Sequence, residues 1–299
     1  MKFVITGGAG FIGSNIAKLL VKNNHKVVIL DNLHTGNLSR LKEIEDEIEF
    51  HKVDIRNFQE IDKIISGIDG IFHEAALTVV PESFEKPEEY FDVNVNGSEN
   101  IFKIAKKHGI KVVYASSSSV YGNVEKVPIK ENSEKNPINP YGKTKVEKEK
   151  LVEKFWKEGV DIIGLRYFNV YGKGQTGTYA GVITQFMKRL ENNLPPIIHG
   201  KGNQIRDFIS VEDIAKANLM AMQSSVMQDF FNVGTGKAIS ILELAKMMIE
   251  ISSKKLSPIF DNELPGDIEK SQADISKSSE KMNWQYQTEL KEGLKKLME

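Results

Sequence analysis

Two side chains that can move a proton stand four residues apart, Tyr141 and Lys145, in a segment that follows Pro140. A spacing of four places a phenol and an ammonium on the same face of a helix. A nearby cation favours the phenolate over the phenol. The pair therefore indicates a general base that takes a proton from an alcohol or sugar hydroxyl. Lys143 and Lys148 are interpreted as solvated residues of the same helix.

A run of four hydroxyl side chains, Ser116–Ser119, follows a short apolar stretch upstream of Tyr141. One of these hydroxyls could donate a hydrogen bond to an oxygen that is being oxidised. At least two of the four are expected only to satisfy the backbone of their own loop. The run supplies a candidate partner for the tyrosine.

A glycine-rich loop near the start of the chain lies between an apolar, β-branched run and a helix-like segment. Gly7 permits a tight turn, Gly10 lets the backbone approach a pyrophosphate, and Gly13 lets the helix pack close to the sheet. The helix N-terminus then faces the phosphates. Asp31, which ends the next apolar run, can accept hydrogen bonds from both adenosine ribose hydroxyls and would repel a 2′-phosphate. The segment predicts a site for NAD rather than NADP.

These segments need a scaffold, and strand-like and helix-like stretches alternate through the first half of the chain. Strands are expected near residues 3–5, 27–31, 49–53, 70–73, 112–115 and 160–167, with helices near 58–66 and 87–107 and after Pro140. This alternation predicts an α/β fold with a Rossmann-type doubly wound parallel sheet, which binds ligands at the carboxyl ends of its strands. Several polar segments fall at such ends: Asp31, Asp54, His73–Ala76, Ser116–Ser119 and Tyr167–Asn169.

Beyond Gly172 the pattern loosens into glycine- and proline-rich loops between shorter elements. We expect a smaller C-terminal α/β lobe that closes over the reactive end of the cofactor. Phe230–Gly234 and the helix Ser240–Ile251 are expected to return to the main sheet. The predicted division is an NAD-binding domain, 1–170 with a return segment at about 208–252, and the smaller lobe, 171–207 with 253–299.

Composition excludes several classes of function. The formal net charge is −1, so no overall attraction to nucleic acid or to an anionic membrane is expected. The chain has no cysteine, which excludes disulfides, thiolate catalysis and cysteine-ligated zinc. No apolar stretch approaches the roughly 20 residues that span a bilayer, and the first residues form a strand rather than a signal peptide. We therefore expect a cytoplasmic protein without a nucleic-acid, membrane or metal partner.

The chain resembles the extended short-chain dehydrogenases/reductases, and most of all their UDP-glucose 4-epimerase branch. The matching motifs stand in order over nearly the whole chain: Thr6–Gly13, Asp54–Arg56, His73–Ala76, Asn94–Gly97, Ser116–Ser119, Tyr141–Lys145, Arg166–Gly172 and Arg206–Asp213. The resemblance implies an isomerase that uses NAD, and a homodimer formed through the helices near 87–107 and 140–157.

The resemblance also implies a role for each matched residue. The catalytic set is Ser117, Tyr141 and Lys145. The cofactor set is Gly7, Gly10, Phe11, Ile12, Gly13, Asp31, Asn32, Asp54, Ile55, Ala75, Ala76, Tyr141, Lys145 and Tyr167, with Asp54 and Ile55 at the adenine. The substrate set is Thr78, Ser117, Ser119, Tyr141, Asn169, His199, Arg206, Asp267 and Ser271, with Asn169 and Arg206 at the diphosphate and His199 near the uracil.

Arg166 is expected to support the fold beneath the site, and His73 to be structural. For Arg206 a surface ion pair with Asp207 is the alternative to a diphosphate contact. For His199 the alternative is an ordinary loop residue.

Three positions depart from the family pattern. The arginine that often precedes the Gly-Asp of the C-terminal loop is absent from Glu263–Asp267, where Asp267 stays a ribose contact. Thr78 stands where some epimerases have a lysine. Ser271 falls at a position that is bulky in strict glucose/galactose enzymes, and a small residue there would leave room for an N-acetyl group.

The implied reaction is epimerisation at C4 of a UDP-hexose, UDP-glucose/UDP-galactose or the N-acetylated pair. A 4,6-dehydratase would need an acidic pair after the catalytic hydroxyl, where this chain has Ser118 and Ser119. A UDP-glucuronate epimerase or decarboxylase, or another nucleotide-sugar reductase of the family, stays open, although no cation for a sugar carboxylate is identified. A non-catalytic NAD-binding protein could lose Tyr141 and Lys145, and both are present.

Overall fold

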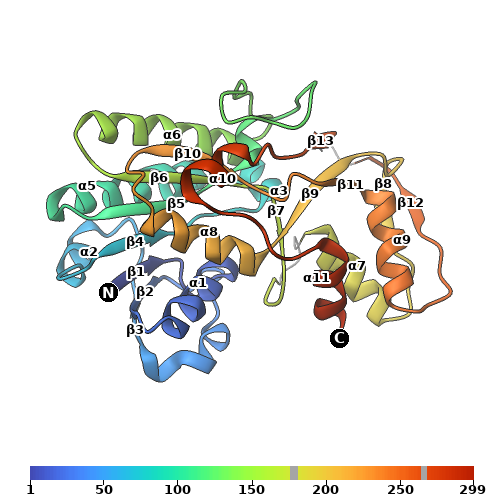
Figure 1. The fold of residues 1–299 in the computed structure, drawn as a ribbon, viewed down its shortest axis with the longest axis horizontal. Helices are drawn as coiled ribbons and strands as arrows, with labels where there is room; N and C mark the ends of the chain where they lie inside the picture. Colours follow the sequence, from blue (N-terminus) through green and yellow to red (C-terminus); the bar gives the residue numbers. More distant parts are fainter. Residues whose placement is uncertain (176–180, 264–267) are drawn as a thin grey trace.

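A parallel sheet forms the centre of the computed structural model, which describes residues 1–175, 181–263 and 268–299. Within these residues the sheet has seven strands in the order β10-β6-β5-β4-β1-β2-β3 (Figure 1). The strands are β1 (Lys2–Thr6), β2 (Lys26–Asp31), β3 (Ile48–Lys52), β4 (Gly70–His73), β5 (Lys111–Ser117), β6 (Ile162–Tyr167) and β10 (Asp229–Val233). All of their pairings are parallel. The predicted Rossmann-type sheet is confirmed.

Helices cover both faces of this sheet, which explains why its central strands are apolar runs rather than alternating ones. One face packs on α1 (Phe11–Lys22) and α8 (Val211–Gln223). The other packs on α2 (Phe58–Ile64), α5 (Ser98–His108) and α6 (Pro140–Lys157). Neighbouring residues of β1 divide between the two cores, since Phe3 and Ile5 face one and Val4 the other.

The strand order reverses between β1 and β4, because the chain builds outward from β1 to β3 and then returns to β4 on its other side. Such a switch point opens a crevice at the carboxyl ends of the two strands. After β4 the chain forms α3 (Val80–Glu85), α4 (Pro87–Phe91) and a π-helical turn, Asp92–Gly97, that runs into α5. Short 3-10 turns lie at Leu38–Arg40, Lys42–Glu47 and Ser118–Val120.

A second unit follows β6. It contains a sheet of order β11-β9-β13, with β7 also paired to β9, and a separate pair of β8 with β12. These strands are β7 (Asn169–Tyr171), β8 (Ile197–His199), β9 (Ile205–Ser210), β11 (Ala238–Ser240), β12 (Ile259–Asp261) and β13 (Lys270–Ser271). Its helices are α7 (Val182–Glu191), α9 (Ile241–Ile251) and α11 (Leu290–Met298), which gather to the right in Figure 1.

The return of the chain to the main sheet is only partly as expected. Phe230–Gly234 does return, because β10 pairs with β6. The helix Ser240–Ile251 does not, since the apolar face of α9, including Leu244 and Met248, packs in the core of the second unit. That part of the prediction is wrong.

Conversely, α10 (Ser276–Met282) lies against β10, and Trp284 is buried in the main core. The predicted domain boundaries stay a prediction. In the described residues no helix combines the length and hydropathy that crossing a membrane requires.

Candidate active site

A cavity of about 610 Å³ opens at the switch point, along the carboxyl ends of the central strands. Most of the predicted cofactor residues line it, together with Thr78. The predicted residues found there are Gly7, Gly10, Phe11, Ile12, Gly13, Asp31, Asn32, Ile55, Ala75, Ala76, Thr78, Tyr141, Lys145 and Tyr167. The structure thus brings the N-terminal loop and the Tyr141 helix to one cavity.

The glycine loop is packed too closely for side chains. Gly7 has a φ of +68°, and a Cβ there would lie 2.7 Å from the Ala75 nitrogen. A Cβ on Gly13 would lie 2.3 Å from the Gly7 oxygen. The first turn of α1 therefore sits directly on the loop, with its free backbone amides at the cavity. This cradle fits the pyrophosphate of a dinucleotide.

Asp31 is fixed at the rim of the same cavity. Its Oδ2 accepts a hydrogen bond from the Ala9 nitrogen (3.0 Å) and its Oδ1 one from the Leu33 nitrogen (2.7 Å). Burial raises the pKa of Asp31, while these two bonds and the charge of Arg40 act in the opposite direction. Each oxygen keeps a lone pair for a further donor, such as a ribose hydroxyl.

Ile55 lines the cavity, whereas its neighbour Asp54 is not among the described residues that do so. Its carboxylate accepts hydrogen bonds from Arg56 Nε, Arg56 Nη2 and Asn32 Nδ2, each of 2.9 Å. These bonds to Arg56 and Asn32 hold the pKa of Asp54 well below its usual range. Asn32 and Arg56 do line the cavity, so Asp54 holds two cavity residues in place.

Tyr141 owes its position to the start of α6. Asn139 caps this helix by accepting a hydrogen bond from the Gly142 nitrogen (2.8 Å), and Pro140 occupies its first turn. A Cβ on Gly142 would lie 2.9 Å from the Ser119 oxygen. The first turn of α6 therefore rests on the serine-rich turn that follows β5.

Lys145 lies beneath the phenol. Its side chain is 2% exposed, and its Nζ donates a hydrogen bond of 3.0 Å to the Ala115 oxygen. The same Nζ is 5.4 Å from the centroid of the Tyr141 ring. A carbonyl at the end of β5 thus fixes the ammonium beside the candidate base.

The serines divide their hydroxyls between support and possible chemistry. Ser116 Oγ donates to Glu149 Oε1 (2.8 Å), and Ser117 Oγ accepts from the Ser119 nitrogen (3.1 Å). Ser119 Oγ is buried and has no partner among the described residues. Because Ser117 uses a lone pair in its bond, its O–H can still donate to a substrate oxygen.

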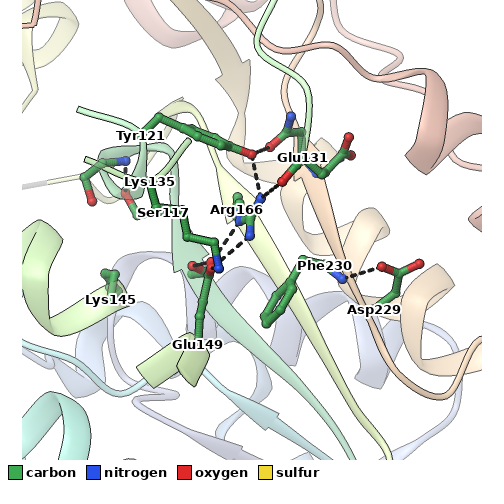
Figure 2. A network of polar contacts seen from close by, with 12 residues as sticks. Ser117, Tyr121, Glu131, Lys135, Lys145, Glu149, Arg166, Asp229 and Phe230 are labelled. Atoms are coloured by element: carbon green, nitrogen blue, oxygen red, sulfur yellow. Dashed lines mark hydrogen bonds and ion pairs between the residues drawn. The ribbon is translucent and has the colours of Figure 1, made fainter. Parts of the chain in front are cut away.

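Beneath the site lies a buried ion-pair network (Figure 2). Arg166 donates from Nε and Nη2 to Glu149, both at 2.8 Å, and from Nη1 to Tyr121 Oη and the Glu131 oxygen, both at 2.7 Å. Lys135 Nζ lies 2.7 Å from Glu149 Oε2. The expectation that Arg166 supports the fold is confirmed.

His73 is structural, as expected. Its side chain is 0% exposed, with Nδ1 2.7 Å from Thr6 Oγ1 and Nε2 2.8 Å from Ser98 Oγ.

The interpretation of Lys148 as solvated is wrong. Its side chain is 0% exposed and its Nζ has no hydrogen-bond partner among the described residues, whereas Lys143 is exposed as expected. Helical phase explains the difference, since Lys148 follows Tyr141 by seven residues and shares its face.

Glu74 is a cavity residue that the sequence reasoning missed. Its Oε1 accepts a hydrogen bond from Tyr167 Oη (3.0 Å), which itself accepts one from Asn218 Nδ2 (2.7 Å). Tyr167 lines the cavity with its hydroxyl directed to Glu74. The motif His73–Ala76 marked this place in the chain, although no spacing distinguished the carboxylate within it.

Arg40 is a second missed residue. It lines the cavity, and its side chain ties the glycine loop to the segment after β7 through bonds to the Ala9 oxygen and the Gly174 oxygen, both 3.1 Å. No motif surrounds Arg40 in the sequence.

Three predicted substrate residues meet on the second sheet. Ser271 on β13 lies opposite Arg206 on β9, and Asn169 on β7 lies opposite Phe208, two residues further along β9. Asn169 Nδ2 donates to the Asp207 oxygen (3.2 Å). These residues form a group beyond the cofactor cavity.

The acid beside Arg206 serves the fold. Asp207 is 0% exposed and accepts hydrogen bonds from the backbone nitrogens of Thr235, Gly236 and Ala273. The alternative of a surface ion pair between Arg206 and Asp207 is therefore wrong.

His199 ends β8, with its Nδ1 3.1 Å from the Asn262 oxygen. Asp267 lies outside the described residues.

Comparison with known proteins gives consistent matches. The family model described as the NAD dependent epimerase/dehydratase family matches residues 3–234. The chain is 39% identical to a provisionally named UDP-glucose 4-epimerase of Methanocaldococcus jannaschii, over 99% of this chain and 96% of that protein.

Two solved structures are equally similar in fold. A UDP-N-acetylglucosamine 4-epimerase from Methanobrevibacter ruminantium M1, in complex with UDP-N-acetylmuramic acid, has a TM-score of 0.95 at 35% identity and covers 99% and 96% of the two chains. A UDP-glucose 4-epimerase from Thermotoga maritima, with UDP-glucose, has a TM-score of 0.95 at 33% identity, over 100% and 97%.

Proposed function

The chain belongs to the NAD dependent epimerase/dehydratase family, and from this premise we propose that it is an NAD-dependent 4-epimerase of a UDP-hexose. The observation that carries the proposal is the Tyr141 phenol at the cofactor cavity, with the Lys145 ammonium 5.4 Å from its ring. Relatives in the UDP-glucose 4-epimerase branch, alike over nearly the whole chain, support this reaction.

The chain's own residues divide the work. Tyr141 Oη takes the proton of the sugar 4-hydroxyl and later returns it, with the Lys145 ammonium 5.4 Å from its ring. Ser117 donates a hydrogen bond to the same sugar oxygen. Asn169 and Arg206 hold the diphosphate. The sugar can then rotate between the two half-reactions and present its other face to the cofactor. NAD, when bound, supplies the acceptor and donor of a hydride at C4.

An epimerase regenerates its cofactor in every turnover, so the protein has no need to release it. The loop around Gly7 and Gly13 encloses the pyrophosphate site closely, and Asp31 is held by two backbone bonds. We therefore expect NAD to stay bound through purification.

For the sugar, we propose that the UDP-glucose/UDP-galactose pair and the N-acetylated pair are both substrates. Ser271 supports this, because a serine at a position that is bulky in strict glucose/galactose enzymes of the family would leave room for an N-acetyl group. The similarity to an enzyme named for UDP-N-acetylglucosamine supports it as well.

We also propose a homodimer formed through the helices near 87–107 and 140–157, which include α5 and α6. Phe91, on α4 at the start of the first of these, is 43% exposed, which is consistent with a covered face between two copies. Light scattering on the purified protein measures this directly. The cytoplasmic location stays a prediction.

The test uses purified protein without added NAD, incubated separately with UDP-glucose, UDP-galactose, UDP-N-acetylglucosamine, UDP-N-acetylgalactosamine and UDP-glucuronate. Interconversion of a 4-epimeric pair is the expected result, with both pairs reaching equilibrium. Conversion of UDP-glucuronate alone would favour a glucuronate epimerase or decarboxylase. No conversion of any sugar, before or after addition of NAD, would refute the proposed function.

A further inference from the structure

Arg40 connects two segments that lie 134 residues apart in the sequence. It ends the 3-10 turn Leu38–Arg40 that follows β2. The other two residues of this turn, Leu38 and Ser39, are exposed, whereas Arg40 is half-buried and lines the cofactor cavity. The mechanism described above assigns no task to this side chain.

The guanidinium of Arg40 donates to backbone oxygens of both segments. Nη1 donates to the Ala9 oxygen (3.1 Å) in the glycine loop and to the Thr35 oxygen (3.4 Å) in the turn after β2. Nε donates to the Gly174 oxygen (3.1 Å), in the segment after β7. Because a guanidinium is planar and holds its donors in a rigid fork, these bonds fix the Gly174 oxygen relative to the glycine loop.

The segment at Gly174 lies beside the first turn of α1. A Cβ on Gly174 would lie 3.8 Å from Arg40 Nε and 3.9 Å from Phe11 Cδ2. Phe11 is the first residue of α1, whose N-terminal amides belong to the pyrophosphate cradle. The next residue of the segment, Gln175, lines the same cavity. The segment therefore lies next to the place where the pyrophosphate of NAD binds.

Gln175 extends the connection into the second unit. Its Nε2 donates to the Val170 oxygen on β7 (3.2 Å), and its Oε1 accepts from Thr184 Oγ1 (2.9 Å). Thr184 lies on α7, is 2% exposed, and is not one of the described residues that line the cavity. A series of hydrogen bonds thus runs from the glycine loop through Arg40 and the Gly174–Gln175 peptide to α7.

We propose that Arg40 is a positioning residue that slows the release of NAD. By tying the segment at Gly174 to the glycine loop, Arg40 keeps this segment beside the pyrophosphate, and NAD leaves only after that bond breaks. The inference rests on the proposed function for the need to retain NAD. It adds that retention depends on a contact between the two units, and not on the glycine loop and Asp31 alone.

The first pair of variants separates this contact from the charge of the side chain. Arg40→Met removes the guanidinium, and NAD should dissociate about 10 to 100 times faster, as expected when hydrogen bonds from a charged donor are lost. Arg40→Lys keeps the positive charge but loses the planar fork that reaches both the Ala9 and the Gly174 oxygens. It should therefore release NAD about as fast as Arg40→Met.

A third variant acts from the other end of the connection. Thr184→Val removes the hydroxyl that donates to Gln175 Oε1 and keeps a β-branched side chain on α7. NAD should dissociate about 2 to 10 times faster, the range expected for one neutral hydrogen bond. Because Thr184 lies outside the cavity, faster release in this variant reports a looser segment rather than a lost contact with the cofactor.

The measurement is the rate of exchange of bound NAD. Purified protein that carries its resident NAD is mixed with an excess of radiolabelled NAD, and the label retained with the protein on a filter is followed over time. This readout needs no sugar and no turnover. Arg189→Met is the matched control, because Arg189 also donates from Nε to a backbone oxygen, that of Pro195, on α7 and away from the cavity residues.

The expected result is faster exchange in Arg40→Met, Arg40→Lys and Thr184→Val, with wild-type exchange in Arg189→Met. Wild-type exchange in either Arg40 variant, or in Thr184→Val, overturns the proposal. If Arg40→Met does not fold, Arg40→Lys and Thr184→Val decide. A wild-type protein that holds NAD but converts no sugar refutes the epimerase function, while the exchange rates still decide the role of Arg40.

Discussion

Arg166 and Glu149 are joined by two parallel hydrogen bonds of 2.8 Å, and their side chains are 1% and 0% exposed. A guanidinium and a carboxylate in this geometry form a strong pair whose separation leaves a buried charge. Through Ser116, which also bonds to Glu149, the pair is linked to the strand that carries Ser117. The support of the fold and the support of the site are therefore the same network.

Breaking this pair should be costly. Arg166→Met is expected to lower the free energy of unfolding by about 3–5 kcal/mol, because Glu149 loses its principal buried partner. Urea unfolding measures the loss. Lys106→Met, which breaks an exposed 2.9 Å pair with Glu158, is the control and should cost less than about 1 kcal/mol. Equal losses in the two variants would contradict a special role for the buried pair.

Removal of the candidate base separates chemistry from cofactor binding. Tyr141→Phe keeps the ring but loses the proton acceptor, so turnover should fall by a factor of roughly 10² to 10⁴. Bound NAD, released by denaturation and quantified by absorbance, should stay at the wild-type level. Tyr286→Phe, in the chain before α11, should leave both quantities unchanged. Wild-type turnover in Tyr141→Phe would exclude this residue as the base.

Asp31 should decide cofactor choice. Asp31→Asn cannot accept both the Ala9 and the Leu33 amide, and it removes the charge that repels a 2′-phosphate. The variant should copurify with less NAD and gain measurable binding of added NADP. Asp46→Asn, on the surface, is the matched control. Full retention of NAD with no binding of NADP would show that Asp31 does not select the cofactor.

Glu74 should make stability depend on pH. Burial raises the folded-state pKa of Glu74 to about 7, well above the ordinary range of a glutamate. The folded state therefore binds this proton more tightly, and the associated stability is present below pH 4.5 and lost as pH rises toward 7. Relative to Glu74→Gln, the wild type should become progressively less stable across that window, by a few kcal/mol at most. Denaturant unfolding at matched pH values measures the difference, and a constant difference would contradict the raised pKa.

The cofactor half of the site was predictable because its residues act through local sequence. The loop at Gly7–Gly13 is short, contiguous and set between a strand and a helix, so its geometry follows from the glycines themselves. Tyr141 and Lys145 are one helical turn apart, which fixes their relative position before any tertiary contact forms.

Burial was not predictable in the same way. Lys143 and Lys148 lie on the same helix with the same residue type, and only the packing of α6 on the sheet makes one exposed and the other buried. Glu74 is similar, because its hydrogen-bond partner Tyr167 lies far away in the sequence. The wrong prediction for α9 has the same cause, since the amphipathic pattern of a helix does not specify which core its apolar face joins.

The placement of β10 has a consequence for how the protein is made. The chain leaves the main sheet after β6, builds β7 and β9, and only then supplies the strand that pairs with β6. A nascent chain that has not yet emerged beyond Asp229 presents β6 as an unpaired edge with open backbone donors and acceptors. The strand that pairs with this edge begins at Asp229, residue 229 of 299. More than three quarters of the chain must therefore be synthesised before β6 is paired on both sides. Until then the growing polypeptide carries a template for intermolecular association, and chaperone engagement should concentrate in that interval of synthesis.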